Sequence, residues 1–410
     1  MADFSIRDVC HINSNTQDDT FVGIRSDNGV FSVNFPMGYH ISTDERGIRN
    51  DILMLLHTIS YAVQNKDSEL IAGSELYTHK GFPLQAYMYV ISDFYNRGYY
   101  KEREIQYHEN VHGKIDWNRT IKKQRPFIHN NDVYYLQFIT RKNPFTENEL
   151  ITQIHEYCVY ESFCKIGWLF TRFLPQKPKI KFNQKQFLYV VREKLNHTFN
   201  DKNKKLFRNL IAIIENVQNP DSPRKFYYGV DPFDHVWEVL IDRVYGIQNK
   251  QEYFPKTEWR LSYGVFENSD LRPDSIMLWN GNVYVLDAKN YKYGMTRNSY
   301  DLPKSTDINK QITYGEFADG YQRNLINGDT VFNTYNAFLM PFDAHEWNND
   351  GYLKWIGEAC SSWKSNTNTY ERIQGVLIDV KTLMIMANNR DENAISELAS
   401  CIEHAVMQGD

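Results

Sequence analysis

The sequence predicts an α/β protein whose C-terminal core is a sandwich of helices and a β-sheet. Three observations predict this class. Residues 231–246 (DPFDHVWEVLIDRVYG) and 305–317 (STDINKQITYGEF) have the apolar spacing of helices, and residues 271–294 contain two β-rich runs around an Asn-Gly pair. The runs YNAFLMPF and GVLIDV are typical of buried strands, and a last helix is expected near 392–407. The order helix, hairpin, helix, strand is that of an α/β sandwich.

The composition suits a globular protein of more than one domain. A chain of 410 residues with 42% hydrophobic residues is long enough for two or three domains. Its 15% aromatic content suits stacking surfaces as well as cores. The net charge of -5 does not indicate a nucleic-acid binder, so the local distribution of charge must decide.

The sequence carries no targeting or disulfide signature. Its five cysteines are scattered and lack C-x-x-C pairs, which favours neither a disulfide framework nor a zinc knuckle. The N-terminus has no basic-then-apolar signal, and no apolar run reaches the roughly 18 residues that span a membrane. We therefore expect a cytoplasmic protein.

Residues 1–145 are expected to form an α+β domain. A hairpin is predicted around Asp27-Asn28-Gly29, followed by a helix through about Gln64 and a second helix that ends at Gly98. Beyond it, residues 100–142 alternate like strands.

A basic segment, GKIDWNRTIKKQR, lies at the centre of this β-like region. It is either a solvated loop or a finger that reaches a phosphate or a partner protein. Lys114 and Arg119 are the candidate partner contacts.

The segment His108 to His112 fits the H-E-x-x-H pattern of zinc proteases. That chemistry needs both histidines on one helix face. Gly113 follows at once and the preceding residues alternate like a strand, so the context argues against a protease.

Residues 146–218 are predicted to be a helical, basic middle region. A long buried helix starts near Thr146, and residues 176–209 hold ten Lys or Arg interleaved with aromatic residues. This stretch is either a DNA-backbone footprint or a pair of amphipathic helices with a solvated lysine face. The candidate DNA contacts are Lys185, Arg192, Lys202, Lys204, Lys205 and, further along, Lys292. The linker at 219–225 then introduces a C-terminal domain over 219–410.

The hairpin at 271–294 has a defined register. The Asn-Gly pair at 280–281 supplies the positive φ angles of a two-residue type I′ turn. The pairs that follow are Ile276 with Val285 and Asp274 with Asp287. Lys289 lies two residues beyond Asp287, on the same face, because side chains alternate along a strand.

The two facing carboxylates need a compensating charge. Their repulsion costs roughly 0.2–1 kcal/mol at an exposed pair and more when buried. A divalent cation held by Asp274 and Asp287 would offset it, and carboxylates without a Cys or His cluster favour Mg²⁺ or Mn²⁺. Lys289 beside such a metal can orient or deprotonate a water, or stabilise charge on a phosphate. The alternative is a frayed surface hairpin, and Glu238, on the preceding helix, is either a third carboxylate or a surface residue.

These motifs resemble those of the PD-(D/E)XK nuclease superfamily, with a glutamate on a helix, then R-P-D, a hairpin and D-A-K. The longer set FVGIR, RNDILMLL, VWEVLIDRVYG, LRPDSIM and KQITYGEF resembles the LlaJI family of restriction endonucleases, related to the McrC-type nuclease subunit, over nearly the whole chain. The resemblance implies a mixed sheet flanked by helices, Asp274 and Asp287 as Mg²⁺ ligands, and Lys289 serving the attacking water. Glu238, as a further ligand, and Gln311 would complete the site. Asp287 stands where the superfamily more often has Glu.

The same resemblance implies a Mg²⁺-dependent endonuclease that cuts double-stranded DNA in a restriction or phage-defence system. McrC-like subunits work with a GTP-hydrolysing, McrB-like AAA+ ring, and this sequence has no G-x-x-x-x-G-K-[ST] loop of its own. Residues 1–145 would dock into that ring, and a double-strand cut would need two active sites, in a homodimer or a larger assembly. The alternatives are a self-sufficient type II restriction enzyme and a non-catalytic DNA-binding or assembly subunit.

Overall fold

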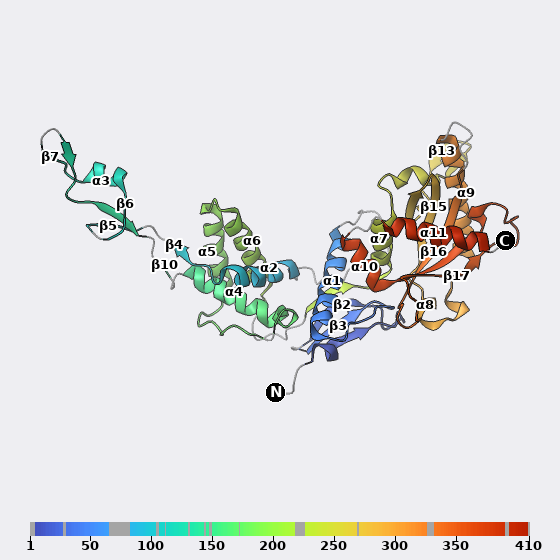
Figure 1. Ribbon diagram of the computed structural model, residues 1–410, viewed down its shortest axis with the longest axis horizontal. Helices are drawn as coiled ribbons and strands as arrows, with labels where there is room; N and C mark the ends of the chain where they lie inside the picture. The colour runs from blue at the N-terminus through green and yellow to red at the C-terminus, as the bar shows by residue number, and fades with distance from the viewer. Residues whose placement is uncertain are drawn as a thin grey trace. The chain divides into compact units, whose positions relative to one another are not determined.

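The computed structural model describes residues 5–27, 30–64, 83–103, 106–110, 112–129, 132–142, 145–146, 150–171, 173–217, 226–268, 270–325, 332–389 and 393–408. The chain divides into two compact units (Figure 1). Met1–Lys80 and Pro223–Asp410 form the first, called here the discontinuous unit, and Gly81–Ser222 form the second, the inserted unit. The predicted linker at 219–225 lies outside the described residues.

The discontinuous unit is built around a five-stranded mixed sheet of order β14-β15-β16-β18-β17. The strands are β14 (Ser275–Trp279), β15 (Asn282–Ala288), β16 (Thr334–Phe342), β17 (Leu353–Ala359) and β18 (Ile373–Asp379). The β14–β15 and β17–β18 pairs are antiparallel, whereas β16 runs parallel to both of its neighbours. Every residue of β16 and β18 is buried, as expected for strands that are covered on both faces. The two predicted buried strands are therefore confirmed.

Helices cover both faces of this sheet. Val285 of β15 packs with Tyr314 of α9 (Ser305–Leu325) in one buried cluster. Its neighbour Tyr284 faces the other way, because side chains alternate along a strand, and donates a hydrogen bond of 2.5 Å to Glu403 of α11 (Asn393–Gln408).

A third helix, α7 (Asp234–Tyr245), packs against β14 and β15. Its buried Trp237 donates from Nε1 to the Leu339 carbonyl of β16 over 3.0 Å. The predicted order helix, hairpin, helix, strand is confirmed, and the core is a mixed sheet flanked by helices. The helix predicted over 231–246 begins only at Asp234, with Phe233 at its N-cap position.

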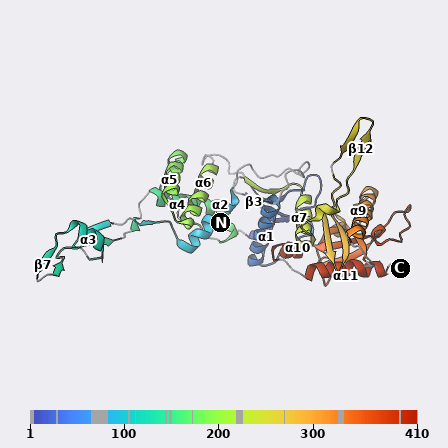
Figure 2. The ribbon, with the colours of Figure 1, turned by 90° about the horizontal axis from the view of Figure 1, so that it is seen from above.

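Shorter elements connect these parts. The hairpin of β12 and β13 projects from the sheet in Figure 2, and almost all of its residues are exposed. The bounds are η3 (Lys250–Tyr253), β12 (Glu258–Leu261), β13 (Gly264–Glu267), α8 (Tyr293–Thr296), η4 (Ser299–Asp301), η5 (Thr369–Glu371) and α10 (Val380–Asn389).

A second sheet, of order β1-β3-β2-β11, joins the two ends of the discontinuous unit. Its elements are η1 (Ile6–Val9), β1 (Cys10–Ile12), β2 (Val22–Asp27), β3 (Val30–Phe35) and β11 (Phe226–Val230), with α1 (Glu45–Gln64) following β3. The predicted N-terminal hairpin is the β2–β3 pair, and the predicted helix through Gln64 is α1. Because β11 pairs with residues 22–26 of β2, residues 1–80 group with the C-terminal part of the chain rather than with residues 81–145. The compact units thus differ from the three predicted domains.

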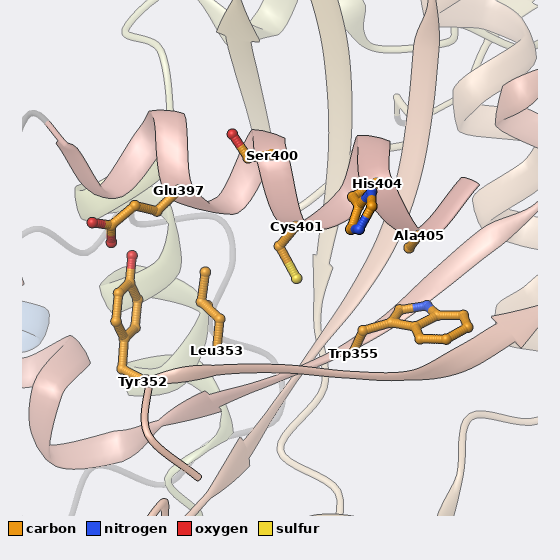
Figure 3. Close-up of a pocket in the computed structure, with 9 residues that line it drawn as sticks. Tyr352, Leu353, Trp355, Glu397, Ser400, Cys401, His404 and Ala405 are labelled. Carbon is orange, nitrogen blue, oxygen red and sulfur yellow. The ribbon is translucent and has the colours of Figure 1, made fainter. Parts of the chain in front are cut away.

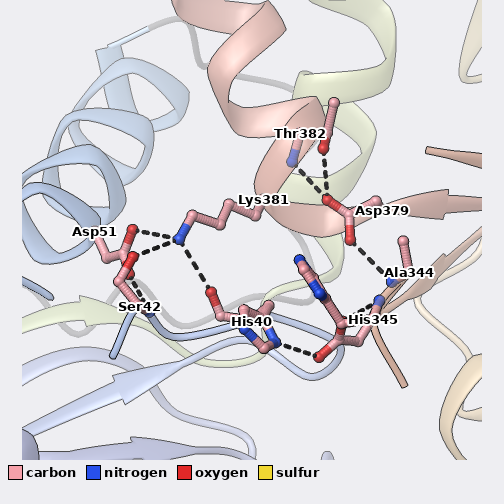
Figure 4. A network of polar contacts seen from close by, with 9 residues as sticks. His40, Ser42, Asp51, Ala344, His345, Asp379, Lys381 and Thr382 are labelled. Carbon is pink, nitrogen blue, oxygen red and sulfur yellow. Dashed lines mark hydrogen bonds and ion pairs between the residues drawn. The ribbon is translucent and has the colours of Figure 1, made fainter. Parts of the chain in front are cut away.

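A network of polar contacts ties α1 to the end of β18 and the start of α10 (Figure 4). The Lys381 ammonium lies 2.8 Å from the buried Asp51 carboxylate and donates to Ser42 Oγ over 2.8 Å. Nearby, His40 Nδ1 lies 3.1 Å from Asp343 Oδ2.

The inserted unit contains a group of four longer helices. They are α2 (Leu84–Arg97), α4 (Leu150–Ile166), α5 (Gln184–His197) and α6 (Asp201–Asn216), and Gly98 ends α2 as predicted. Phe187, Leu206 and Phe207 are buried among them. Short elements complete the unit: β4 (Glu102–Arg103), β5 (Gln106–Glu109), β6 (Lys114–Ile115), α3 (Trp117–Lys123), β7 (Phe127–His129), β8 (Asp132–Tyr134), β9 (Ile139–Lys142), β10 (Phe145–Thr146) and η2 (Gly167–Leu169).

Within the described part of the chain, no helix combines the length and hydrophobicity needed to cross a membrane.

Candidate active site

The hairpin has the predicted register. Ile276 pairs with Val285, and Asn280 and Gly281 have φ angles of 48° and 82°, as a type I′ turn requires. The ladder ends at the pair next to Asp274, so the positions of Asp274 and Asp287 follow directly from it. The main chain is therefore built to bring the two aspartates together.

Asp274 and Asp287 repel each other at the end of this ladder. Burial, together with the negative charges of Asp287 and Glu238, raises the pKa of Asp274 well above its ordinary value. Burial likewise raises the pKa of Asp287, although the ion pair with Lys289 lowers it in part. The Ala288 amide steadies the arrangement by donating to Asp274 Oδ2 over 2.8 Å. Two like charges with raised pKa values at one place are typical of sites that hold a cation or exchange protons.

Lys289 lies with both acids, as predicted. Its Nζ is 2.7 Å from Asp287 Oδ2 and 3.4 Å from Asp307 Oδ1. Burial alone lowers the pKa of Lys289, but the carboxylates of Asp287, Asp274 and Asp307 outweigh it, so the net pKa is raised. Lys289 is therefore a fixed cation and a poor proton acceptor.

One face of α9 lies over the hairpin. Gln311 is buried and donates from Nε2 to the Val285 carbonyl over 2.8 Å, two residues before Asp287. Gln311 thereby binds the backbone of β15. On the same face, Lys310 lies 5.3 Å from the centroid of the Tyr314 ring, and Asp287 is one of the groups whose charge acts on it.

Glu238, also predicted for the site, is partly exposed and lies near a residue of its own helix. Its side chain is 42% exposed and lies 3.5 Å from His235 Nδ1, one turn earlier on α7. Its charge reaches Asp274 and contributes to that raised pKa. Among the described residues, no three His, Cys, Asp or Glu side chains are close enough to share one metal ion. Glu238 therefore does not form a three-carboxylate cluster with the two aspartates in this conformation.

Three charged residues near the site are missing from the sequence prediction. Asp307 contacts Lys289, and Lys310 stands in the field of Asp287. Asp234 accepts a hydrogen bond of 2.8 Å from Asn290 Nδ2, and its pKa is raised, chiefly by burial. A search of α9 for residues on the same helix face as Gln311 would have found Asp307 and Lys310, because residues 307, 310, 311 and 314 share that face.

The predicted DNA contacts lie mainly on α5 and α6. Lys185, Lys202 and Lys205 are exposed, whereas Arg192 lies 2.7 Å from Glu215 Oε1 and Lys204 lies 3.9 Å from Asp201. The amphipathic alternative is confirmed for Phe187 and Phe207, which are buried, whereas Tyr189 and Phe199 are exposed. Lys292, at the start of α8, belongs to the discontinuous unit and is half-buried. A DNA footprint stays a prediction.

The predicted partner segment is folded rather than a simple loop. Lys114 lies in β6, and Asp116 caps α3 by accepting from the Arg119 amide over 3.0 Å. The Arg119 guanidinium stacks 3.7 Å from the centroid of the Tyr107 ring. Its role as a ring contact stays a prediction.

The protease interpretation was rightly rejected. His108 and Glu109 lie in strand β5, and Asn110 has a positive φ of 52°. An H-E-x-x-H zinc site needs a continuous helix at this point, which the strand and turn exclude.

A surface pocket of about 590 Å³ lies apart from these groups, between β17 and α11 (Figure 3). Tyr352, Leu353 and Trp355 face Cys401 and His404 across it. Strand β17 is at the opposite edge of the sheet from β14, so this pocket is remote from the two aspartates. None of the predicted site residues lines it.

Asp274→Asn is expected to stabilise the metal-free protein at neutral pH. An acid whose pKa is raised by folding favours the folded state only while it is protonated. Its contribution therefore falls as the pH rises from the ordinary value of 3.8 through the raised folded value. Asparagine keeps the acceptor for the Ala288 amide and removes the charge.

The measurement is the melting temperature of both proteins in chelator between pH 4 and pH 8. The variant should melt higher at pH 8, and the difference should shrink toward pH 4. An equal difference at every pH would contradict the raised pKa of Asp274.

The fold and the site together define an α/β protein with one buried and one half-buried carboxylate and a lysine at the end of a β-hairpin. The family is shown by the match of residues 21–352 to the model of the LlaJI restriction endonuclease family. This chain belongs to that family.

Two further comparisons give similar proteins. The type II restriction enzyme BsuMI component YdjA of Bacillus subtilis (strain 168) is 28% identical over 263 residues, which cover 60% of this chain. The chain spans 55% of the length of that relative. Among solved structures, a chain of the refined half-complex from a tetradecameric assembly of Thermococcus gammatolerans McrB AAA+ hexamers with bound McrC is 16% identical. That match covers 90% of this chain and 82% of the other, with a TM-score of 0.36.

Proposed function

We propose that this chain is the nuclease component of a restriction system and hydrolyses phosphodiester bonds of double-stranded DNA. The observation that carries the proposal is the meeting of Asp274, Asp287 and Lys289 at the end of one hairpin. Membership of a restriction endonuclease family supports it. We infer further that the mixed sheet with its flanking helices is a PD-(D/E)XK core.

The residues present fit a divalent cation. Two carboxylates that raise each other's cost of ionisation gain from a shared positive charge, and hard oxygen donors suit Mg²⁺ or Mn²⁺. Asp274 and Asp287 would hold the ion, and Glu238 is close enough to act on it through its charge. Bound there, a divalent ion would lower the pKa of a water and stabilise charge on the phosphate.

The other side chains then have separate tasks. Lys289 keeps its proton, so it orients the attacking water or phosphate and stabilises the developing negative charge rather than accepting a proton. Gln311 holds β15 in place through the Val285 carbonyl. Lys310 adds a second positive charge beside Asp287.

We also propose that the chain works in an assembly with an AAA+ GTPase and acts on foreign DNA in the cytoplasm. The similar Bacillus protein is named a component of a type II restriction enzyme. The sequence itself has no phosphate-binding G-x-x-x-x-G-K-[ST] loop. Lys114 and Arg119 would contact the partner, and the cations of α5 and α6 would contact DNA.

The test is the effect of metal on the purified protein, alone and with any AAA+ GTPase that a neighbouring gene encodes. We expect supercoiled plasmid to be cut in Mg²⁺ or Mn²⁺ and left intact in EDTA. We also expect Mn²⁺ to raise the melting temperature of the wild-type protein, because an ion that binds only the folded state stabilises it. Cutting in EDTA would contradict the metal role. No cutting under any condition, with or without the GTPase, would favour a non-catalytic DNA-binding or assembly subunit.

A further inference from the structure

The segment that leads into Asp274 is not held by the sheet. After α7 and η3 the chain leaves the core as the β12–β13 hairpin and returns to the core over residues 270–274. The first ladder pair of β14 is Ser275 with Leu286, one residue too late to hold Asp274 itself. The position of the Asp274 backbone must therefore be set by other contacts.

Hydrogen bonds join the two segments at the base of the β12–β13 hairpin. The Asn268 amide donates to the Thr257 carbonyl over 2.9 Å, and the Leu271 amide donates to the Pro255 carbonyl over 2.9 Å. The Tyr314 hydroxyl donates to the Arg272 carbonyl over 3.3 Å. These contacts bring the segment that follows the hairpin close to the site, but the last of them is at Arg272, two residues before Asp274.

Lys250 makes the contact at Asp274. Its Nζ donates to the Asp274 carbonyl oxygen over 2.6 Å and lies 2.8 Å from Asp242 Oδ1 on α7. The side chain is 22% exposed, so this ammonium is largely shielded from water. An ammonium has three donors and no acceptor, which suits it to join a carbonyl and a carboxylate.

Helix α7 is itself fixed to β14, which makes Asp242 a firm anchor. The Ile247 amide, just beyond the helix, donates to the Ile276 carbonyl over 2.9 Å. At Gly246 a Cβ atom would approach Asp242 Oδ1 to 2.4 Å and Ser275 Oγ to 2.8 Å, so the helix end packs closely on the strand. Lys250 thus links the end of α7 to the residue just before β14, two elements that are already joined by a backbone hydrogen bond.

We propose that Lys250 is a positioning residue for the catalytic carboxylate of Asp274, anchored by Asp242. Lys250 fixes the backbone carbonyl of Asp274, while the Ala288 amide fixes its carboxylate. Together they set the distance between Asp274 and Asp287 before any ion binds. The inference rests on the proposed nuclease function and adds to it a residue that contacts neither DNA nor metal.

The test compares Lys250→Met with Lys250→Arg and Lys256→Met. Methionine keeps the length of the side chain and removes the donors, arginine keeps a donor and a charge, and Lys256 is an exposed lysine near the root of the same hairpin. For Lys250→Met we expect kcat to fall and the half-saturating Mg²⁺ concentration to rise, by about 10-fold or more, as for other residues that orient metal ligands. The KM for DNA should stay unchanged. Lys250→Arg should recover most of the loss, and Lys256→Met should match the wild type.

A second readout does not depend on cleavage. The Ala288 amide is protected by the Asp274 side chain, so its hydrogen exchange in metal-free buffer reports where that carboxylate lies. We expect faster exchange at Ala288 in Lys250→Met and unchanged exchange in Lys256→Met. Unchanged exchange at Ala288 in Lys250→Met would overturn the proposal.

The two readouts separate the possible failures. If the wild-type protein neither cuts DNA nor responds to Mn²⁺, the proposed function fails, and the exchange measurement still decides whether Lys250 positions Asp274. If the wild type cuts and Lys250→Met has an unchanged Mg²⁺ requirement, the positioning role fails while the nuclease function stands.

Discussion

Asp287→Asn is expected to lower the rate of DNA cleavage by at least about 100-fold, the loss seen when a group that stabilises the transition state is removed. Asp287 is 3% exposed, lies 2.7 Å from Lys289 Nζ and is one of the two carboxylates proposed to hold the metal ion. Asparagine keeps its shape and removes half of the proposed metal-binding pair. DNA binding should survive, because the cations proposed to contact DNA lie elsewhere.

The measurement pairs a plasmid-cleavage assay with DNA binding in Ca²⁺, and with the melting temperature in Mn²⁺. Asp274→Ala and Lys289→Ala should also abolish cleavage. Glu267→Gln, which removes an exposed carboxylate from β13, is the matched control and should cut normally. Retained cutting by the variants of Asp274, Asp287 and Lys289 would refute the site. Loss of both cutting and DNA binding would point instead to unfolding.

Lys381→Met is expected to cause the largest loss of stability outside the site. The Asp51 carboxylate is 4% exposed, and Lys381 is its only ion-pair partner among the described residues. Removing one member of a buried pair leaves the other charge uncompensated, which costs about 3–5 kcal/mol when both are fully buried. Because the Lys381 side chain keeps 23% exposure, we expect a smaller loss, of about 2–3 kcal/mol.

The measurement is urea unfolding of the metal-free protein followed by far-UV circular dichroism. Arg260→Met is the control, because the Arg260–Glu258 pair is also short, at 2.5 Å, but its side chains are 81% and 37% exposed. Exposed pairs contribute roughly 0–1 kcal/mol, so this variant should unfold like the wild type. Equal midpoints for the two variants would show that the Lys381 network does not hold the discontinuous unit together.

The central hairpin could be predicted in detail from local chemistry. The turn type demanded by Asn280 and Gly281 fixes the pairing, and the pairing fixes Asp274, Asp287 and Lys289. Such a prediction works because every step depends on neighbours in sequence.

The surroundings of the hairpin could not be predicted in this way. Lys250 reaches Asp274 from the other end of the β12–β13 excursion, and Asp307 reaches Lys289 from α9. Those contacts depend on how separate elements pack, which no local pattern specifies. The same reason explains why the prediction for Glu238 placed it on the correct helix but did not show that it turns toward His235.

The division of the chain into two compact units could not be predicted from the sequence for a related reason. Strand β2 has the alternating pattern of any hairpin strand. Its sequence, Val22–Asp27, does not show that its second neighbour in the sheet is Phe226–Val230. The sequence of β12 and β13 likewise does not show whether their apolar residues are buried, and Trp259 remains 63% exposed in the structure.

The pairing of β2 with β11 also sets an order of events during synthesis. When the β2–β3 hairpin leaves the ribosome, the strand that completes its sheet has not been made, and the whole inserted unit must be translated first. The inserted unit has its own buried helical core and can fold meanwhile, so the growing chain carries an open strand edge beside a finished domain. Closing a sheet across so long a separation is slow. Factors that shield nascent chains should therefore matter more for the yield of this protein than for a variant in which β11 directly follows β2.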